Sequence, residues 1–353
     1  MGQEPVSIFG RMADGTPVER VVLCGEDGFR VSVISYGAAV QSILAPDRDG
    51  HLADIVLGHD TLAGYMASRD YFGATIGRYA NRIAGGAFSL GGRRFRVEPN
   101  DGPNALHGGA GGFDTRLFEV ESREPCRVVL RRTSPAGEEG FPGRLDIRVA
   151  YEVQRCALLI ELSAAGDADT LVNLANHSYF NLAGEASGTA LDHALFIAAD
   201  AFLPVDAVAI PTGERRPVAG SPFDFRTARR VGERIRHADE QLALARGYDH
   251  NFCLRGGRTA EPRLVARLSD QASGRVLEVE TDEAGLQLYS GNALTGAVRG
   301  KGGRLHRQGD AVCLEAQAFP DAPNRPDFPS THLAAGETYR HRIRYRFSTA
   351  PLP

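Results

Sequence analysis

Two ionisable side chains lie within runs of residues that otherwise read as buried strands. His177 lies in the run 173–182, among amides and a tyrosine, and Glu315 lies in the run 311–318. Imidazole changes its charge near neutral pH, and a carboxylate in an apolar strand is costly unless it is hydrogen-bonded or functional. These two positions are therefore candidates for chemistry rather than for core packing.

Rigid, half-apolar elements must position these two groups. Side chains of an extended chain alternate between two faces, so His177 shares a face with Tyr179, and Glu315 shares a face with Gln317. The opposite faces are apolar: Leu174, Phe180 and Leu182 in the first run, and Val312, Leu314 and Ala316 in the second. Each run is thus predicted to turn one face to a core and the other to chemistry.

Polar side chains that a core would not select also occur in segments 78–82, 104–109, 248–251 and 287–292. Taken singly, each has a structural explanation. His107 is flanked by glycine and suits a loop, and Asp249 can organise a turn. Arg82 can form a surface ion pair, and Gln287 can satisfy a sheet edge. None of the four predicts a site by itself.

Short alternating runs separated by glycine and proline recur along the whole chain, which predicts an all-β protein. The runs are 21–23, 29–34, 55–57, 88–97, 128–132, 145–153, 158–162, 195–198, 264–268, 276–280, 286–289 and 340–347. Helical patterns are confined to residues 227–236 and 240–246. We therefore expect one domain over residues 1–353, a large antiparallel β-sandwich with a few short helices, in which two sheets bury their inner faces against each other.

Composition narrows the class of protein further. The formal net charge of -4 provides no electrostatic footprint for nucleic acid. The five cysteines are widely spaced without a CxxC pair, which fits neither a disulfide framework nor a zinc site, so we expect reduced core thiols. Residues 1–5 carry an acid where a secretory signal carries bases, and no long apolar span follows. A cytoplasmic protein without membrane contact is expected.

Five ordered motifs connect the scattered polar residues. They are 77–83 (GRYANRI), 100–109 (NDGPNALHGG), 176–182 (NHSYFNL), 247–252 (GYDHNF), and 314–317 (LEAQ) followed by 320–324 (PDAPN). Together these motifs resemble those of the aldose 1-epimerase, or mutarotase, family. The resemblance covers essentially the whole chain, and no motif position departs from the family pattern.

The resemblance implies a β-supersandwich that interconverts the α and β anomers of free aldohexoses such as galactose and glucose. By the same resemblance, Glu315 would be the general base and His177 the general acid. The substrate-binding residues would be Asn81, Arg82, His107, Tyr179, Asp249 and Gln287. A small sugar is the expected partner, and the protein is expected to be a monomer or a homodimer.

The residue types fit the reaction that the resemblance implies. Opening a hemiacetal requires removal of the proton from the anomeric hydroxyl and protonation of the ring oxygen, which a carboxylate and an imidazolium can supply. Opposite charges would favour protonated His177 beside ionised Glu315. No electron, hydride or acyl group moves, so we expect neither a cofactor nor a metal.

An aromatic platform for the sugar ring must come from phenylalanine or tyrosine, because the chain has no tryptophan. Proximity to the motifs makes Tyr179, Phe180, Phe252 and Tyr289 the candidates.

Other functions stay open on the residues alone. A cupin-like isomerase would bind a divalent metal through His107, His177 and Glu315, although the histidines lack the H-x-H spacing of one strand face. A silent carbohydrate-binding module would not need the Glu and His pair. A hexose-6-phosphate epimerase would need a basic cluster beyond Arg82. A glycoside hydrolase would need a second carboxylate, for which Asp249 is the candidate.

Overall fold

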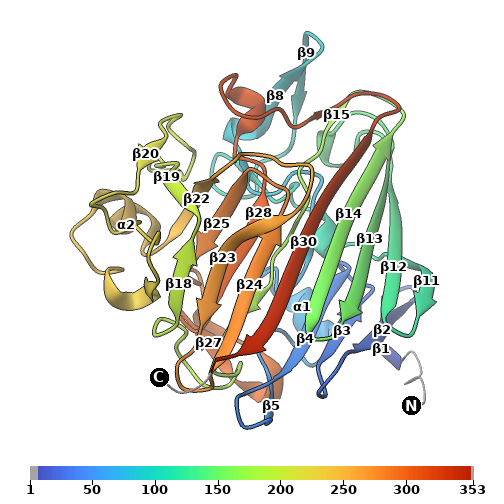
Figure 1. Ribbon diagram of the computed structural model, residues 1–353. Coiled ribbons are helices and arrows are strands. Elements are labelled where there is room, and N and C mark those ends of the chain that lie inside the picture. The colour runs from blue at the N-terminus through green and yellow to red at the C-terminus, as the bar shows by residue number, and fades with distance from the viewer. Residues whose placement is uncertain (1–6, 351–353) are drawn as a thin grey trace.

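The computed structural model describes residues 7–350, which form a predominantly antiparallel β structure (Figure 1). Residues 1–5, on which the targeting expectation rests, lie outside the described part of the chain. Within residues 7–350, no helix has the length and apolar character needed to cross a membrane.

The largest sheet has nine strands and an alternating pattern of buried and exposed side chains. In β13, for example, Val149 is buried while Arg148 points to solvent and pairs with Glu121. In sheet order the strands are β11 (Glu119–Glu124), β12 (Arg127–Ser134), β13 (Leu145–Gln154), β14 (Ala157–Gly166), β30 (Thr338–Thr349), β24 (Arg275–Thr281), β23 (Arg263–Ser269), β18 (Ala194–Ile197) and β21 (Arg229–Arg230). One face of this sheet therefore belongs to the core and the other carries charge pairs.

A six-stranded sheet packs behind the nine-stranded one, as the positions of β25 and β28 in Figure 1 show. Its strands, in sheet order, are β17 (Tyr179–Phe180), β28 (Val312–Gln317), β25 (Gly285–Tyr289), β22 (Asp249–Leu254), β19 (Ala199–Phe202) and β20 (Arg216–Pro217). A five-stranded sheet contains β1 (Ser7–Arg11), β2 (Pro17–Cys24), β3 (Arg30–Ile34), β4 (Ala39–Pro46) and β5 (Leu52–Asp54).

One apolar core joins the three sheets. Leu314 of β28, Ile343 of β30 and Val31 of β3 all belong to it, and each is at most 1% exposed. Burial of such side chains from two facing sheets is the main favourable term in folding. The predicted all-β sandwich is confirmed; the single domain over residues 1–353 stays a prediction.

Short paired strands and helices complete the described fold. The pairs are β6 (Thr75–Ile76) with β16 (Ala175–Asn176), β7 (Arg82–Ile83) with β10 (Ala105–Leu106), β8 (Ala87–Leu90) with β9 (Arg93–Arg96), β15 (Thr170–Leu171) with β29 (His332–Leu333), and β26 (Thr295–Arg299) with β27 (Leu305–Arg307). The α-helices are α1 (Leu62–Ala67) and α2 (Glu240–Ala245).

The two helical predictions had different outcomes. The one over residues 240–246 is confirmed by α2, whose N-cap Asp239 accepts hydrogen bonds from the main chain of Gln241 and Leu242. The helix over residues 227–236 is wrong, because Arg229 and Arg230 pair with β18 and only Val231–Glu233 forms a 3₁₀ turn. Edge pairing has replaced the helix there. The helix α1, capped by Thr61, was not predicted.

The cysteine prediction is partly wrong. All five cysteines are free, as expected, but only Cys313 is fully buried. Cys24 and Cys126 are exposed, because they lie at the end of β2 and in the turn between β11 and β12.

Candidate active site

Three neighbouring strands of the six-stranded sheet form the floor of the candidate site. Glu315 of β28 lies opposite Gln287 of β25, and Gln287 lies opposite Asn251 of β22. Two positions along, Tyr289 lies opposite Asp249 in the same register. Because side chains alternate along a strand, both rows point away from the apolar core. The alternation predicted for residues 311–318 is confirmed.

The run 173–182 is not one continuous strand, and that prediction is wrong. It contains two-residue strands, β16 and β17, which pair with different partners: β6 and β28. His177 lies between them, where its main-chain N–H donates to the carbonyl oxygen of Ala74, and its own carbonyl accepts from Gly73. His177 is therefore held by its backbone against the segment that follows Phe72.

The pairing of β7 with β10 forms another wall of the site, beside the floor and the segment that contains His177. Leu106 lies opposite Arg82 in that pairing, which brings His107 next to Asn81. Asn81 and His107 both have positive φ, 65° and 53°, a conformation that is uncommon for residues other than glycine and that often marks functional sites.

These elements enclose a cavity of about 490 Å³. Seven of the eight predicted site residues line it: Asn81, Arg82, His107, His177, Tyr179, Asp249 and Glu315. Gln287 instead lines a small adjoining cavity of about 10 Å³, together with Asn81, Arg82 and Asp249. The structure thus brings together all eight residues that the resemblance implied, with Gln287 in the adjoining cavity.

The two predicted proton-transfer groups face each other in this cavity. Nε2 of His177 lies 3.5 Å from Oε2 of Glu315, and the two side chains are 5% and 3% exposed. Burial raises the pKa of Glu315 well above its usual value; the Asp249 carboxylate raises this pKa further and Arg82 opposes the rise. Burial also lowers the pKa of His177 to about 4.

When the pair holds one proton, these shifts favour its position on Glu315, with His177 neutral. The charge distribution predicted from the sequence was the reverse, because it considered the attraction between opposite charges and not the cost of burying both. The number of protons on the pair is the same in either arrangement. Sugar hydroxyls that donate to the carboxylate would favour its ionised form and so restore the predicted arrangement.

Arg82 links two acidic side chains at one side of the cavity. Its Nε donates to Oδ2 of Asp101 over 2.7 Å, and its Nη1 lies 3.7 Å from Oδ2 of Asp249. The side chain of Arg82 is 13% exposed, so these charges interact in a partly desolvated setting. Arg82 can therefore hold Asp249 in place while it donates to a ligand.

The residues that could ligate a metal lie close enough together, but the hydrogen bond to one of them does not suit a metal ligand. Ligand atoms of His107, His177 and Glu315 lie within 4.8 Å of one another. However, the main-chain N–H of Asn81 donates to Nδ1 of His107 over 3.1 Å. Nδ1 is therefore the unprotonated nitrogen, and Nε2 of neutral His107 carries the hydrogen. A metal-ligating histidine normally donates through its other nitrogen, so His107 suits a hydrogen-bond donor better than a metal ligand.

Two of the four candidate aromatic platforms line the cavity, namely Tyr179 and Tyr289. Phe180 and Phe252 belong instead to the apolar core between the sheets, because their positions in β17 and β22 have the opposite parity. Arg78, from the first motif, is also structural. Its guanidinium is buried and donates to the carbonyl oxygens of residues 134, 135, 142 and 143.

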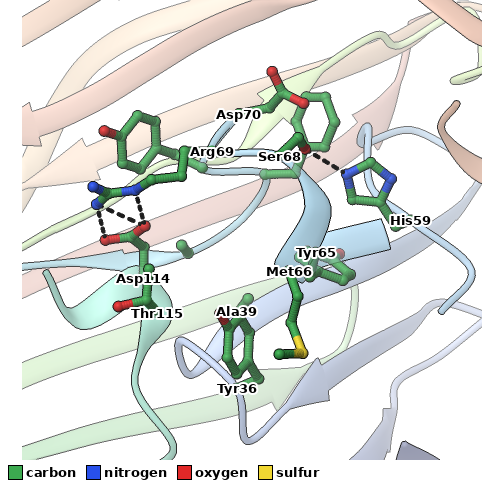
Figure 2. Close-up of a pocket in the computed structure, with 13 residues that line it drawn as sticks. Tyr36, Ala39, His59, Tyr65, Met66, Ser68, Arg69, Asp70, Asp114 and Thr115 are labelled. Atoms are coloured by element: carbon green, nitrogen blue, oxygen red, sulfur yellow. Dashed lines mark hydrogen bonds and ion pairs between the residues drawn. The ribbon is translucent and has the colours of Figure 1, made fainter. Parts of the chain in front are cut away.

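The segment after α1 supplies site residues that the sequence did not indicate. Asp70 and Tyr71 line the large cavity on one side and a pocket of about 40 Å³ on the other. Figure 2 shows this smaller pocket, in which Arg69 pairs with Asp114 and Ser68 approaches His59. Segment 68–72 has no alternating pattern and no motif, so residue order alone carried no signal for it.

Comparison with known proteins identifies the family of the chain. The family model described as aldose 1-epimerase matches residues 19–346. A galactose mutarotase from Bos taurus is 43% identical over 98% of both chains, and an aldose 1-epimerase from Haemophilus influenzae is 35% identical over 95% of this chain and 97% of its own.

Solved structures agree in the same way. A galactose 1-epimerase from Lactobacillus acidophilus superimposes with a TM-score of 0.85 at 30% identity, over 98% of this chain and 99% of its own. An aldose epimerase homologue from C. elegans has a TM-score of 0.86 at 31% identity, over 95% and 100% of the two chains. The resemblance read from the five motifs is confirmed, and the chain belongs to the aldose 1-epimerase family, whose members are isomerases that act on carbohydrates.

Proposed function

We propose that this protein interconverts the anomers of free aldohexoses such as galactose and glucose, and that Glu315 and His177 transfer the protons. The observation that carries the proposal is the 3.5 Å separation of Nε2 of His177 and Oε2 of Glu315 at the wall of a polar cavity. Mutarotation acts on two oxygens bonded to one carbon, the anomeric hydroxyl and the ring oxygen. An acid and a base this close together can each reach one of them.

The proposed reaction needs no group beyond these two side chains and the sugar. Glu315 takes the proton of the anomeric hydroxyl, the bond from C1 to the ring oxygen breaks, and His177 gives a proton to that oxygen. The open-chain aldehyde then rotates about its C1–C2 bond. His177 takes the proton back as the ring oxygen attacks the other face of C1, and Glu315 protonates the new hydroxyl. Each proton transfer contributes about 10²- to 10⁴-fold.

The remaining residues of the cavity provide hydrogen bonds to a polyhydroxylated ring. Asp249 accepts, Arg82 and Nε2 of His107 donate, and the side chain of Asn81 can do either. The rings of Tyr179 and Tyr289 supply apolar surface beside these polar groups. Convergent polar groups beside aromatic rings are typical of sugar sites.

The charges around the cavity favour a neutral sugar over a sugar phosphate. The basic residues that line it are Arg69, Arg82 and Arg246, and the acidic ones are Asp70, Asp101, Asp206, Asp249 and Glu315. Two of the arginines are already paired, Arg69 with Asp114 and Arg82 with Asp101. A phosphate needs free, convergent donors, and an acidic excess repels it.

Polarimetry of freshly dissolved α-D-glucose and α-D-galactose tests the proposal directly. We expect the wild-type protein to accelerate the approach to equilibrium, with or without EDTA, and Glu315→Gln to bind sugar without accelerating it. Loss of activity in EDTA would assign the three potential ligands to a metal. Absence of acceleration with either sugar, together with acceleration of glucose 6-phosphate, would overturn the proposed substrate class.

The proposal includes a reducing compartment such as the cytoplasm and a monomeric or homodimeric state. The five cysteines are widely spaced along the sequence without a CxxC pair, a pattern that supports a reducing compartment. Light scattering of the purified protein would measure the oligomeric state.

A further inference from the structure

The imidazole of His177 is oriented by packing rather than by hydrogen bonds. Among residues 7–350, its Nδ1 is buried without a hydrogen-bond partner. Its Nε2 faces Glu315 at 3.5 Å, which is longer than an ordinary hydrogen bond. A histidine ring can rotate broadly about its second side-chain torsion. Something other than a hydrogen bond must therefore keep Nε2 directed toward the reacting oxygens.

Two tyrosine rings lie nearly parallel to the imidazole. The ring of Tyr179 lies at a centroid distance of 5.0 Å and an interplanar angle of 19° from His177. The ring of Tyr71 lies at 5.7 Å and 20°. His107 and Tyr289 approach edge-on, at 76° and 79° to the same ring. Two nearly parallel neighbouring rings restrict rotation of the imidazole out of its plane, while its Nε2 lies 3.5 Å from Oε2 of Glu315.

Tyr179 belongs to β17, but Tyr71 reaches the site through an unusual backbone turn. The segment that pairs with His177 runs through Ala74 and Gly73, and the chain reverses at Tyr71, whose carbonyl oxygen accepts from the N–H of Ala74. Tyr71 has a φ of 60°, a value at which a bulky residue is an outlier. Such conformations persist where the surroundings impose them, often at functional sites.

Arg69 fixes the segment that carries Tyr71. Figure 2 shows its guanidinium against the carboxylate of Asp114, with Nε and Nη2 donating over distances of 2.9 to 3.1 Å. The same guanidinium donates to the carbonyl oxygens of Gly109 and Ala110, and it lies 5.2 Å from the centroid of the Tyr71 ring. The position of Tyr71 is thus determined from both sides.

We propose that Tyr71 is a positioning residue for His177. Resting on the proposed role of His177 in proton transfer, the proposal assigns two effects to the Tyr71 ring. It keeps Nε2 aimed at the sugar oxygens that Glu315 also reaches, and it shields the imidazole from water. The same ring also contacts His107 edge-on at 4.6 Å, so it connects the two histidines of the site.

Replacing the aromatic ring of Tyr71 distinguishes an effect on the orientation of His177 from an effect on sugar binding. We expect Tyr71→Leu to lower kcat by roughly 10- to 100-fold, because a small displacement of a reacting group costs about that much, while sugar affinity changes little. Tyr71→Phe keeps the ring and should restore most of the lost turnover. Tyr36→Leu is the matched control, because Tyr36 lines the small pocket on the other side of segment 68–72 and is not among the rings packed on His177.

A second readout does not depend on turnover. Imidazole NMR signals of His177, identified by their loss in His177→Asn, should titrate near pH 4 in the wild type and at a higher pH in Tyr71→Leu, since water then reaches the ring. If Tyr71→Leu misfolds, Tyr71→Asn takes its place, because asparagine tolerates a positive φ.

Unchanged kcat and an unchanged His177 titration in Tyr71→Leu would overturn the positioning role. Equal losses in the Phe and Leu variants would also overturn it, since they would assign the effect to the hydroxyl group. Full turnover in His177→Asn would instead refute the proposed function of His177, and the NMR titration would still decide whether Tyr71 controls its environment.

Discussion

Gln287 donates a hydrogen bond of 2.6 Å from its Nε2 to Oδ1 of Asp249, across the neighbouring strands β25 and β22. The other carboxylate oxygen of Asp249 lies 3.7 Å from Nη1 of Arg82. Asp249 is therefore held from two sides. Gln287, which does not line the main cavity, would then act on the sugar through Asp249.

Replacement of Gln287 by leucine should weaken sugar binding more than it slows the proton transfers. The change removes one donor to Asp249 and leaves that carboxylate less well oriented, which costs about 1–3 kcal/mol for a hydrogen bond to a charged group. We expect KM to rise roughly tenfold to a hundredfold, with a smaller change in kcat. Initial rates over a range of sugar concentrations measure both. A fall in kcat at constant KM would contradict the assigned role.

The polar rows of the floor could be predicted in part from the sequence. Alternation in residues 311–318 placed Glu315 on the face opposite Leu314, as the structure has it. Alternation says nothing about register between strands, so the neighbours Gln287 and Asn251 came only from the structure. The alternation within one strand shows which face each side chain takes, but it does not show which distant strand lies beside it.

The surroundings of His177 could not be predicted for a related reason. Its run contains two short strands paired with β6 and β28, and no local periodicity encodes that change of partner. Tyr71 lies outside every motif used, and its position depends on one backbone reversal. Tertiary contacts decide both features, so the motifs indicated which residues to expect at the site but not the packing around them.

Substitution of either proton-transfer group should remove most of the turnover. Glu315→Gln keeps the shape of the side chain and removes the base, and His177→Asn removes the acid. Each should lower kcat by about 10²- to 10⁴-fold while sugar binding persists. Polarimetry measures the rate and calorimetry the binding. Glu161→Gln is a suitable control, because Glu161 pairs with Arg340 on the solvent face of the nine-stranded sheet. Normal turnover in Glu315→Gln would show that Glu315 is not the base.

Replacement of Arg82 by alanine should affect both binding and rate. It removes a donor from the cavity and leaves the carboxylates of Asp101 and Asp249 without their shared cation. Arg82 also opposes the rise in the pKa of Glu315, so its loss should make that carboxyl harder to ionise. We expect kcat/KM to fall roughly tenfold to a hundredfold, as for loss of a charged hydrogen bond. An unchanged KM would show that Arg82 has no contact with the sugar.

The dependence of kcat/KM on pH should reflect one proton shared by Glu315 and His177. Below the lowered pKa of His177, about 4, both groups are protonated and no base is left. Above the raised pKa of Glu315 neither is protonated and no acid is left. Activity should therefore persist down to about pH 4. The falls in activity at low and at high pH reflect the two titration steps of the Glu315–His177 pair rather than of single residues. An acid limb near the ordinary histidine value of 6.5 would indicate a solvated imidazole.

His250 should make the fold sensitive to acid. It lies on the core face of β22, where Nδ1 accepts from the N–H of Asp249 and Nε2 lies 3.2 Å from Oε1 of Gln241. Burial lowers its pKa from 6.5 to about 3. The unfolded chain thus binds a proton below pH 6.5 that the folded chain does not, so this contribution to stability is complete above pH 6.5 and is lost as the pH falls toward 3.

Comparing the wild type with a His250 variant at two pH values separates the contribution of His250 from that of the other titrating groups. His250→Leu should lower the free energy of unfolding at pH 7 by about 1–3 kcal/mol, because the N–H of Asp249 loses its acceptor. Between pH 7 and pH 5, the wild type should lose about 2 kcal/mol more than the variant, since only the wild type has this imidazole. Groups such as His193 and Glu185, with pKa values lowered to about 4 and raised to about 7, titrate equally in both proteins and cancel. Urea unfolding at the two pH values measures the difference, and identical losses in both proteins would show that His250 is protonated within the folded core.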